Sequence, residues 1–322
     1  MTAGNSGNGG GRNNIDLGPG SEFDLVRTLL AEWGKAAQRI GDDAAVLDVP
    51  KGERLLVSTD TSVEGVHFQR DWLSSFEIGY RATAASLSDL AAMAARPLGI
   101  LIALTLPKGD VDEAREFAIG IREGASAVMC PIVGGDLSSG KDLSLTITAL
   151  GSSARPLSRS GAKAGQRVYV TGRLGGPASA VRAWRAGKEP TESDRGRFAN
   201  PVPRIEPAIA LVERGATSGI DISDGLIADL GHVAAASKVS IEINADQIPR
   251  VEGVSPAQAA NSGEEYEIVV TAPEIDTRQF SEKFGLELTE VGRVVAGRPG
   301  VTLLQAGKRI STQPGFDHFR DK

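Results

Sequence analysis

Cysteine, histidine, aromatic residues and long apolar runs are all scarce in this sequence. Its 322 residues include one cysteine, Cys130, and three histidines, which excludes an intramolecular disulfide framework and a zinc site built from cysteines. Aromatic residues make up only 5% of the chain, so an aromatic-rich binding face is not expected. The longest apolar run, Leu98 to Leu106, is too short to cross a bilayer.

An excess of positive charge is also missing. The 35 Lys and Arg side chains are outnumbered by 41 Asp and Glu, which gives a formal net charge of −6. Because nothing in this balance favours phosphate neutralisation, we expect neither nucleic acid nor membrane as a partner. Residues 1–20 are rich in Gly and Asn and resemble neither a signal peptide nor an anchor. They predict a disordered tail and a cytoplasmic protein.

The remaining chain has the length and apolar content of two folded domains. Stretches with strand and helix patterns alternate in both halves, which predicts an α/β or α+β architecture. A loop with Pro, Ser and cationic residues at 151–165 separates the halves, so we predict an N-terminal domain over 21–151 and a C-terminal domain over 152–322. Residues 188–204 are polar and interrupted by Pro, and they predict a surface excursion.

Aspartates in special positions are the most informative pattern. Asp60 follows an apolar strand, Asp136 follows two glycines, and Asp221 lies in a strand just before a turn. Strand ends are where open α/β sheets bind ligands. Asp89 instead lies in an Ala-rich helix among small apolar neighbours, where a carboxylate costs free energy unless a cation meets it.

Several carboxylates with Ser and Thr hydroxyls, and no Cys or His cluster, indicate a site for Mg²⁺ or Mn²⁺. Magnesium held by few protein ligands usually also binds substrate phosphates. The alternative is that aspartates beside glycines, such as Asp43 and Asp224, are turn or cap residues. That alternative does not account for Asp89 or Asp60. His67 could contact a substrate or be structural, and Arg159 could bind a phosphate or be solvated.

Seven stretches, in the same order along the chain, resemble the thiamine-monophosphate kinase family. They are Gly41-Asp-Asp-Ala-Ala45, Ser58-Thr-Asp-Thr61 with Glu64-Gly-Val-His-Phe68, Ser86-Leu-Ser-Asp-Leu-Ala-Ala-Met93, Gly134-Gly-Asp136, Leu157-Ser-Arg-Ser-Gly161, Asp221-Ile-Ser-Asp-Gly-Leu226 and Gly315-Phe-Asp-His-Phe319. Each is weakly specific alone, but together they span nearly the whole chain. The wider superfamily resembles aminoimidazole ribonucleotide synthetase.

The resemblance implies a two-domain fold. An N-terminal mixed sheet with helices would bind ATP and metal and form a homodimer, and a C-terminal α/β sandwich domain would complete the substrate site. It also implies ATP-dependent phosphorylation of thiamine monophosphate to thiamine diphosphate, the last step in making that cofactor. The acceptor phosphate needs no general base, because its second pKa is about 6 and it is mostly dianionic at neutral pH.

The same resemblance assigns roles to individual residues. Several Mg²⁺ ions would be held by Asp43, Ser58, Thr59, Asp60, Asp89, Asp136, Asp221 and Asp224. ATP would contact Gly135, Asp136, Arg159 and Ser223, and the thiamine phosphate pocket would contain His67, Glu264 and Phe316. Asp60 and Asp89 are expected to be the catalytic residues, as bridging metal ligands without a general base.

Two motifs depart from the family pattern. Where the family usually has Gly-Gly-Glu-Asp-Tyr, this chain has Ser262-Gly-Glu-Glu-Tyr266, and Phe316 stands where Tyr is common. The longer Glu265 side chain and the more restricted Ser262 backbone affect the stretch that contains Glu264. A stacking role for the Phe316 ring is retained, whereas a hydroxyl contact is lost.

Three alternatives stay open at this stage. The chain could be a sister ATP-dependent enzyme, chiefly the cyclo-ligase, since the selenophosphate synthetase and hydrogenase-maturation relatives carry a terminal-region cysteine and Cys130 is the one cysteine here. It could be a non-catalytic nucleotide-binding subunit, although none of the metal positions is lost. The aspartates could also be purely structural.

Overall fold

The computed structural model describes residues 21–107 and 111–311, and the predicted N-terminal tail lies outside this range. In the N-terminal half the elements are α1 (Ser21–Trp33), the 3₁₀ helix η1 (Gly34–Ala36), β1 (Arg54–Val63), α2 (Ser75–Ala92), β2 (Arg96–Leu106), α3 (Val111–Ser126), β3 (Ile132–Ser139) and β4 (Ser144–Ser153). Within the described ranges, no helix is long and apolar enough to cross a membrane.

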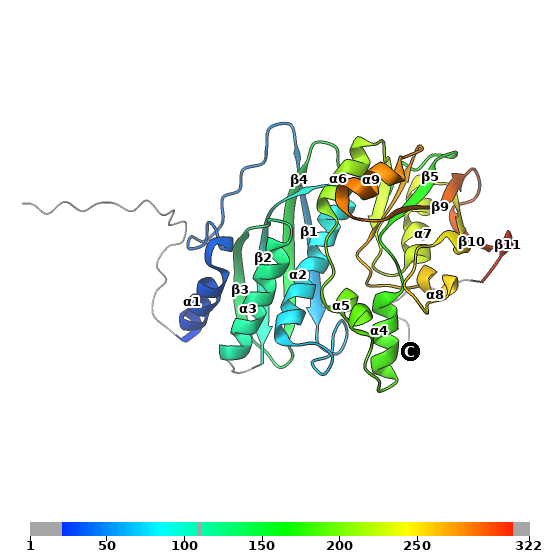
Figure 1. Cartoon of the computed structure of the whole chain (residues 1–322). Coiled ribbons are helices and arrows are strands. Elements are labelled where there is room, and N and C mark those ends of the chain that lie inside the picture. Colours follow the sequence, from blue (N-terminus) through cyan, green and yellow to red (C-terminus); the bar gives the residue numbers. More distant parts are fainter. Residues whose placement is uncertain (1–20, 108–110, 312–322) are drawn as a thin grey trace, which may run out of the picture.

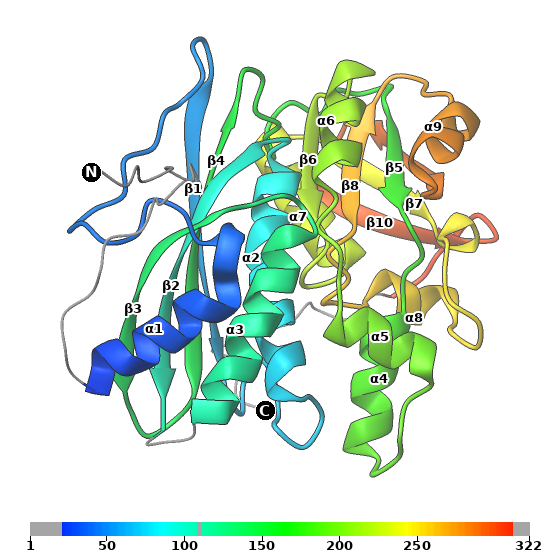
Figure 2. The ribbon, with the colours of Figure 1, turned by 60° about the vertical axis from the view of Figure 1, so that its left-hand side comes forward.

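The N-terminal half is built on a four-stranded sheet in the order β1-β4-β2-β3. β4 pairs antiparallel with β1 and β2, whereas β2 and β3 are parallel, so the sheet is mixed as expected. Helices α2 and α3 pack against one another and lie on the same side of the sheet (Figures 1 and 2). The opposite side is not covered by any described helix.

The two faces of β1 differ in exposure because side chains alternate along a strand. Leu55 and Val57 are 50% and 59% exposed on the uncovered face. Leu56, Ser58 and Asp60 are half-buried on the face toward α2. The strand therefore presents Ser58 and Asp60 to the helical side, whereas the exposed Leu55 and Val57 lie on the open side.

The C-terminal half has a seven-stranded mixed sheet in the order β11-β10-β7-β9-β5-β8-β6. Its elements are β5 (Arg167–Thr171), α4 (Gly176–Arg185), α5 (Glu192–Ala199), α6 (Ile205–Glu213), β6 (Ser218–Asp221), α7 (Leu226–Ser237), β7 (Ser240–Asn244), the 3₁₀ helix η2 (Ala245–Gln247), α8 (Pro256–Ala260), β8 (Ile268–Ala272), α9 (Thr277–Phe284), β9 (Leu288–Val295), β10 (Gly300–Gln305) and β11 (Lys308–Arg309). This agrees with the predicted α/β layer arrangement.

Alternating residues of the C-terminal sheet belong to two hydrophobic clusters. Val168 and Val170 of β5 join the cluster that contains α7. Tyr169 joins the other cluster, which contains α6, α9 and the core of the N-terminal half. The hydrophobic interior is therefore continuous between the halves on one side of this sheet.

The segment 188–204, predicted as a surface excursion, is instead folded and partly buried. It contains α5, whose Phe198 is only 2% exposed. Arg195 of α5 forms two hydrogen bonds with Glu77 of α2, and the rings of Trp72 and Trp184 stack 5.2 Å apart nearby. The sequence suggested a loop because α5 is short and polar, and its apolar end is buried only by tertiary contacts of Phe198 with Arg81 of α2 and Trp184 of α4.

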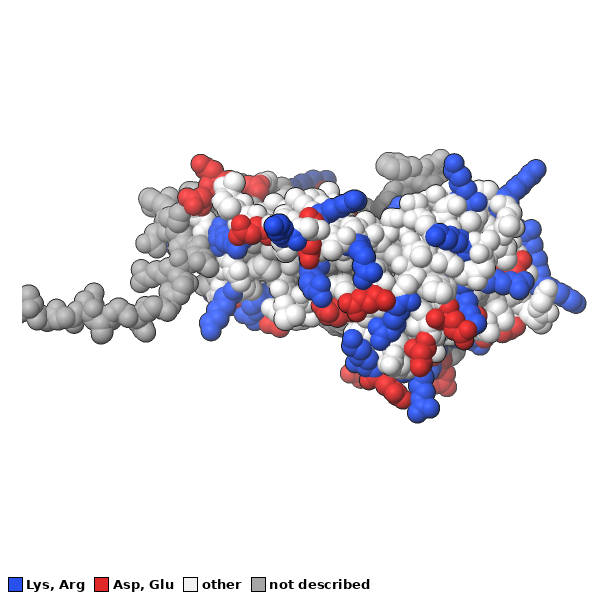
Figure 3. All heavy atoms as spheres, turned by 90° about the horizontal axis from the view of Figure 1, so that it is seen from above, with Lys and Arg blue, Asp and Glu red and all other residues white. Residues whose placement is uncertain are grey.

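Charged side chains are distributed over the surface in both halves. In the view from above, Lys and Arg are interspersed with Asp and Glu (Figure 3). Many of them form exposed ion pairs, such as Arg278 with Glu282. Pairs of this kind contribute little to folding free energy.

Candidate active site

Three of the predicted carboxylates meet where the two halves join. Asp60 comes from β1, Asp89 from α2 and Asp221 from the last position of β6. The Ser58 hydroxyl donates to an Asp89 carboxylate oxygen, and Ser88 Oγ donates to Asp221 Oδ2 over 2.7 Å. We call Asp60, Asp89 and Asp221 the junction carboxylates.

The junction carboxylates repel one another. Burial raises the pKa of Asp60 to about 6, with further contributions from Asp89 and Glu264. Burial and then Asp89 raise the pKa of Asp221 to about 7. In the described part of the chain, no Lys, Arg or His forms an ion pair with any of the three. Uncompensated carboxylates of this kind favour the binding of a cation.

A cavity of about 590 Å³ opens beside this group. Its lining combines Ser58, Asp89 and Asp221 with Ser158, Arg159 and Ser160 of the loop before β5. The exposed Arg159 side chain is the cationic residue of that lining, and the N-terminal half supplies Asp89 while the C-terminal half supplies both Asp221 and Arg159. This arrangement suits a ligand that carries phosphates and a cation together.

The turn after β6 is fixed by a carboxylate that the sequence analysis did not select. Asp229 of α7 accepts hydrogen bonds from the backbone N–H groups of Ser223, Asp224 and Gly225, each at 3.1 Å. Asp229 is 2% exposed, and burial raises its pKa to about 7. Asp229 is the fourth residue of a helix that begins directly after a turn of small polar residues, and an acidic side chain in the first turn of a helix is the signal that could have identified it.

Glu264 approaches the same region from the segment before β8. Its carboxylate accepts a hydrogen bond from Arg81 of α2 over 2.5 Å and another from the Tyr266 hydroxyl. Arg81 is buried in α2 and was also not selected from the sequence. A cation on an Ala-rich buried helix face is as unusual as the carboxylate of Asp89, and the same reasoning would have found it.

A second group of predicted residues lies elsewhere. Asp43, Gly135 and Asp136 line a cavity of about 520 Å³ with Thr146 and Thr148, on the face of the sheet opposite α2. Thr59 joins this side, since its hydroxyl is 3.0 Å from that of Thr148. Within one chain, the structure therefore does not bring these residues to the junction carboxylates.

Two aspartates expected at strand ends lie inside strands. Asp60 pairs with Ile147 in the middle of β1, and Asp136 pairs with Ala103 in β3. Polar residues after Leu55–Ser58 and the glycines before Asp136 suggested that the strands stop there. Both strands continue because their neighbours in the sheet supply backbone partners. An alanine Cβ at Gly135 would lie 2.1 Å from the carbonyl oxygen of Ile102, so this stretch of β3 requires glycine.

Of the other residues predicted to contact the substrate, His67 is described by the structure and Phe316 is not. His67 is half-buried after β1, and its Nδ1 accepts a hydrogen bond from the Val63 backbone over 3.1 Å. Phe316 lies outside the described residues. The departure at Glu265 places a buried carboxylate whose Oε1 accepts the Gly175 N–H over 2.5 Å, at the start of α4.

We predict a pH-dependent contribution of Glu265 to stability. Burial raises its pKa from 4.5 to about 8. The folded state then holds a proton that the unfolded state releases, so this contribution is complete below pH 4.5 and is lost as the pH rises to about 8. Urea unfolding at pH 6 and pH 8.5 should show the free energy of unfolding falling by ~2 kcal/mol more in the wild type than in Glu265→Gln. Equal changes in both proteins would contradict the raised pKa.

The residue types at the junction suit Mg²⁺, because carboxylate and hydroxyl oxygens are the ligands of hard cations. The proposed ligands do not form a complete metal site in this structure. In the described ranges, no group of three or more Asp, Glu, His or Cys is arranged to hold a metal ion. The uncompensated charge of the junction carboxylates is the observation that supports a cation here.

Comparison with known proteins defines the class. Family models for the AIR synthase related protein N-terminal and C-terminal domains match residues 41–153 and 163–304. Hydrogenase maturation protein HypE from Escherichia coli shares this fold at 18% identity, with a TM-score of 0.74 and coverage of 92% of this chain and 98% of HypE. The molecule is thus an AIR synthase related two-domain protein.

More similar relatives identify the family within that class. The thiamine-monophosphate kinase of Escherichia coli K12 is 36% identical, over 92% of this chain and 95% of the relative. The crystal structure of thiamine-monophosphate kinase from Stenotrophomonas maltophilia K279a matches with a TM-score of 0.80 and 34% identity, over 90% and 98% of the two chains. AaThiL complexed with AMPPCP and TMP matches with a TM-score of 0.74 and 30% identity, over 92% and 97%. The chain belongs to the thiamine-monophosphate kinase family.

Proposed function

We propose that this chain phosphorylates thiamine monophosphate with ATP, giving thiamine diphosphate and ADP. Membership of the family and the AaThiL complex with AMPPCP and TMP support both substrates. Within the chain itself, the junction carboxylates are the observation that carries the proposal, because a pair of phosphorylated substrates needs a site where cations neutralise their charge. The cyclo-ligase alternative is not favoured by these relatives.

The chemistry required of the protein is positioning rather than proton abstraction. The acceptor phosphate is mostly dianionic at neutral pH, so it is already a competent nucleophile. Junction residues must therefore hold two anionic substrates in line and compensate their repulsion. Arg159 would contact nucleotide phosphates directly, and the amides of Ser223 and Asp224 are held in one orientation by Asp229.

Magnesium is proposed as the cofactor, and bound Mg²⁺ would neutralise phosphate charge and fix its geometry. The proposed ligands are Asp43, Ser58, Thr59, Asp60, Asp89, Asp136, Asp221 and Asp224. ATP would contact Gly135, Asp136, Arg159 and Ser223, and the acceptor would contact His67, Glu264 and Phe316. The domain limits 21–151 and 152–322 and the cytoplasmic location also remain predictions.

Release of ADP tests the proposed function. The wild-type protein is incubated with Mg-ATP and thiamine monophosphate, beside controls with thiamine, without an acceptor and with EDTA. ADP formation only with the monophosphate and Mg²⁺, with thiamine diphosphate as product, is expected. ATP binding without ADP formation would overturn the acceptor, and formylglycinamidine ribonucleotide would then be tested for the cyclo-ligase activity.

A homodimer through the open face of the N-terminal sheet is proposed as well. Leu55, Val57 and Leu101 expose apolar surface there, and the two cavities lie on opposite faces of the sheet in one chain. A partner on the open face would bury the apolar side chains and close the cavity that contains Asp136.

The Leu55→Lys variant is predicted to weaken this dimer. A lysine on an edge strand is tolerated by a folded monomer but opposes burial against a second copy. Light scattering at micromolar concentration should give the dimer mass for the wild type and a mass closer to the monomer for the variant. Val202→Lys, at a 44% exposed site in the C-terminal half, is the control that should leave the mass unchanged. A monomeric wild type would refute the dimer.

A further inference from the structure

One face of α2 is bonded to the C-terminal half along its length. Glu77 pairs with Arg195, Arg81 with Glu264, and Ser88 with Asp221. These positions are four and seven residues apart, which places them on one side of a helix. Asp89 adjoins Ser88, so the helix that supplies a junction carboxylate also contacts the segment that supplies Glu264.

Arg81 is held from several directions. It is 5% exposed and donates a hydrogen bond to the backbone carbonyl of Phe198 as well as to Glu264. Its guanidinium carbon lies 3.8 Å from the centre of the Phe198 ring and 5.6 Å from that of Tyr266. A guanidinium fixed by a carbonyl and two rings has little freedom to follow a moving partner. The partner must adopt the position that Arg81 dictates.

The backbone around Glu264 is fixed as well. Glu264 and Tyr266 have φ values of +63° and +52°, in the left-handed region that non-glycine residues rarely adopt. Their backbone N–H groups donate to Ser223 and Ile222, over 2.7 and 2.9 Å. Such strained conformations persist where the surroundings determine them, and they gather at functional sites. The segment is thereby attached to the turn after β6.

The two oxygens of the Glu264 carboxylate differ in their hydrogen bonds. Oε2 accepts both the Arg81 and the Tyr266 hydrogen bonds, and among the described residues no group bonds to Oε1. The Glu264 side chain is 35% exposed, so Oε1 is accessible to a ligand. Burial raises the pKa of Tyr266 well above its usual range, so its hydroxyl stays a donor at neutral pH.

We propose that Arg81 and Tyr266 are positioning residues that fix Oε2 of Glu264 and thereby direct Oε1 to the acceptor substrate. The inference rests on the proposed function, because thiamine monophosphate carries a cationic thiazolium ring that a carboxylate oxygen complements. Arg81 acts from the N-terminal half and Tyr266 from the C-terminal half. The acceptor contact is therefore correct only when the two halves are correctly joined.

Tyr266→Phe tests the proposal, because it removes the hydroxyl and keeps the ring. We expect the Kd for thiamine monophosphate by calorimetry and the KM for it to rise about tenfold, with the KM for ATP changed less than about twofold. In a Glu264→Gln background, the same substitution should change the Kd less than about twofold, since its effect is transmitted through that carboxylate. Arg81→Lys, which keeps the charge and loses the planar fork, should act in the same direction.

Tyr169→Phe is the matched control. It also removes the hydroxyl of a buried tyrosine. That hydroxyl accepts the N–H of Ile275, between β8 and α9, and it forms no contact with the junction carboxylates. It should leave both KM values unchanged. Three results would each overturn the positioning role. They are additive effects of Tyr266→Phe and Glu264→Gln on the Kd, equal changes in the KM values for both substrates, and an unchanged Kd in Tyr266→Phe. A wild type that binds thiamine monophosphate without turnover would overturn the proposed function alone, and a wild type that does not bind it would overturn both.

Discussion

Replacing Asp60 with Asn is expected to lower kcat at least about a hundredfold and to leave the fold intact. The substitution keeps the size of the side chain and removes the negative charge that would help to hold Mg²⁺. Since Asp89 and Glu264 both repel the Asp60 carboxylate in the absence of a cation, the neutral variant should be no less stable than the wild type. Steady-state kinetics at several Mg²⁺ concentrations, together with urea unfolding, measure the two effects.

A carboxylate outside the junction provides the comparison for Asp60. Asp142 is exposed in the turn before β4, and Asp142→Asn should leave both kcat and the Mg²⁺ requirement unchanged. Near-normal turnover of Asp60→Asn at all Mg²⁺ concentrations would refute the role of Asp60 as a metal ligand. Loss of activity accompanied by a large loss of stability would assign Asp60 a structural role instead.

Arg204→Met is expected to destabilise the C-terminal half by about 3–5 kcal/mol. Arg204 donates two hydrogen bonds to Glu267, over 2.9 and 2.6 Å, and Thr171 Oγ1 donates a third over 2.6 Å. The Glu267 side chain is only 3% exposed, so removal of the guanidinium leaves a buried charge without its counter-ion. The midpoint of urea unfolding reports this loss.

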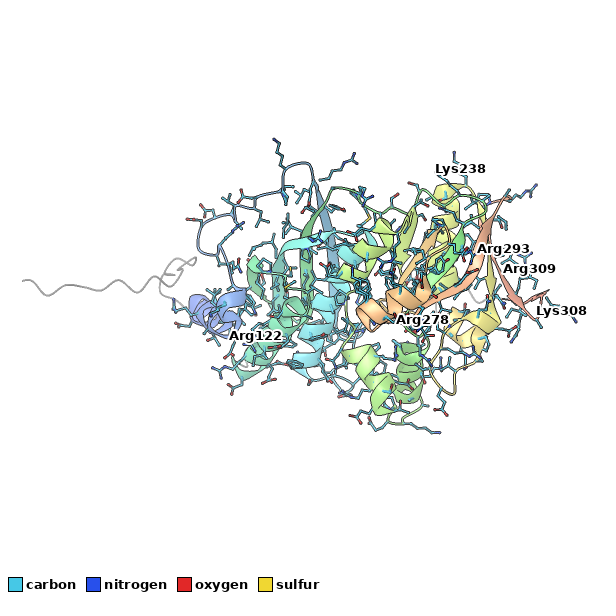
Figure 4. The ribbon with its side chains drawn as sticks, turned by 45° about the horizontal axis from the view of Figure 1, so that its top comes forward. Arg122, Lys238, Arg278, Arg293, Lys308 and Arg309 are labelled. Carbon is cyan, nitrogen blue, oxygen red and sulfur yellow. The ribbon has the colours of Figure 1, made fainter. Side chains whose placement is uncertain are left out.

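Two further variants separate the buried charge from lost packing. In Arg204→Met with Glu267→Met, no charge remains unpaired, and a large part of the stability should return. Arg293→Met breaks a pair with Glu242 that also has two hydrogen bonds, but the Arg293 side chain projects from β9 and is 69% exposed (Figure 4). Its cost should stay within about 1 kcal/mol. Equal costs for Arg204→Met and Arg293→Met would contradict the importance of burial.

The sequence alone identified the residues whose chemistry conflicts with their surroundings. Asp89 was selected because a carboxylate on an Ala-rich helix needs a partner. In the structure it lies close enough to Asp60 and Asp221 to raise the pKa of both carboxyl groups. Arg81 satisfies the same criterion on the same helix, but its partner Glu264 lies 183 positions away and is not evident from the sequence. Asp229 was overlooked because its role is to hold backbone N–H groups, which no residue pattern displays directly.

Some assignments required knowledge of the sheet. Ser58, Thr59 and Asp60 are consecutive in β1, so Thr59 faces away from the other two once the strand is known to continue through them. The glycines before Asp136 are typical of a turn, yet they lie inside β3 because β2 supplies the pairing. A strand that reads as broken can be completed by a neighbour that is distant in sequence.

The sequence by itself determined the two α/β halves, the family and the oxygen-rich chemistry of the site. Those features depend on residue type and on periodicity over a few neighbouring positions, which are written directly in the chain. The tertiary structure decided which carboxylates meet, that Asp43 and Asp136 lie on the other face of the sheet, and that Arg81 holds Glu264. The contacts between the halves join residues more than 100 positions apart, such as Ser88 and Asp221, and they arise only when hydrophobic burial packs α2 against the C-terminal half.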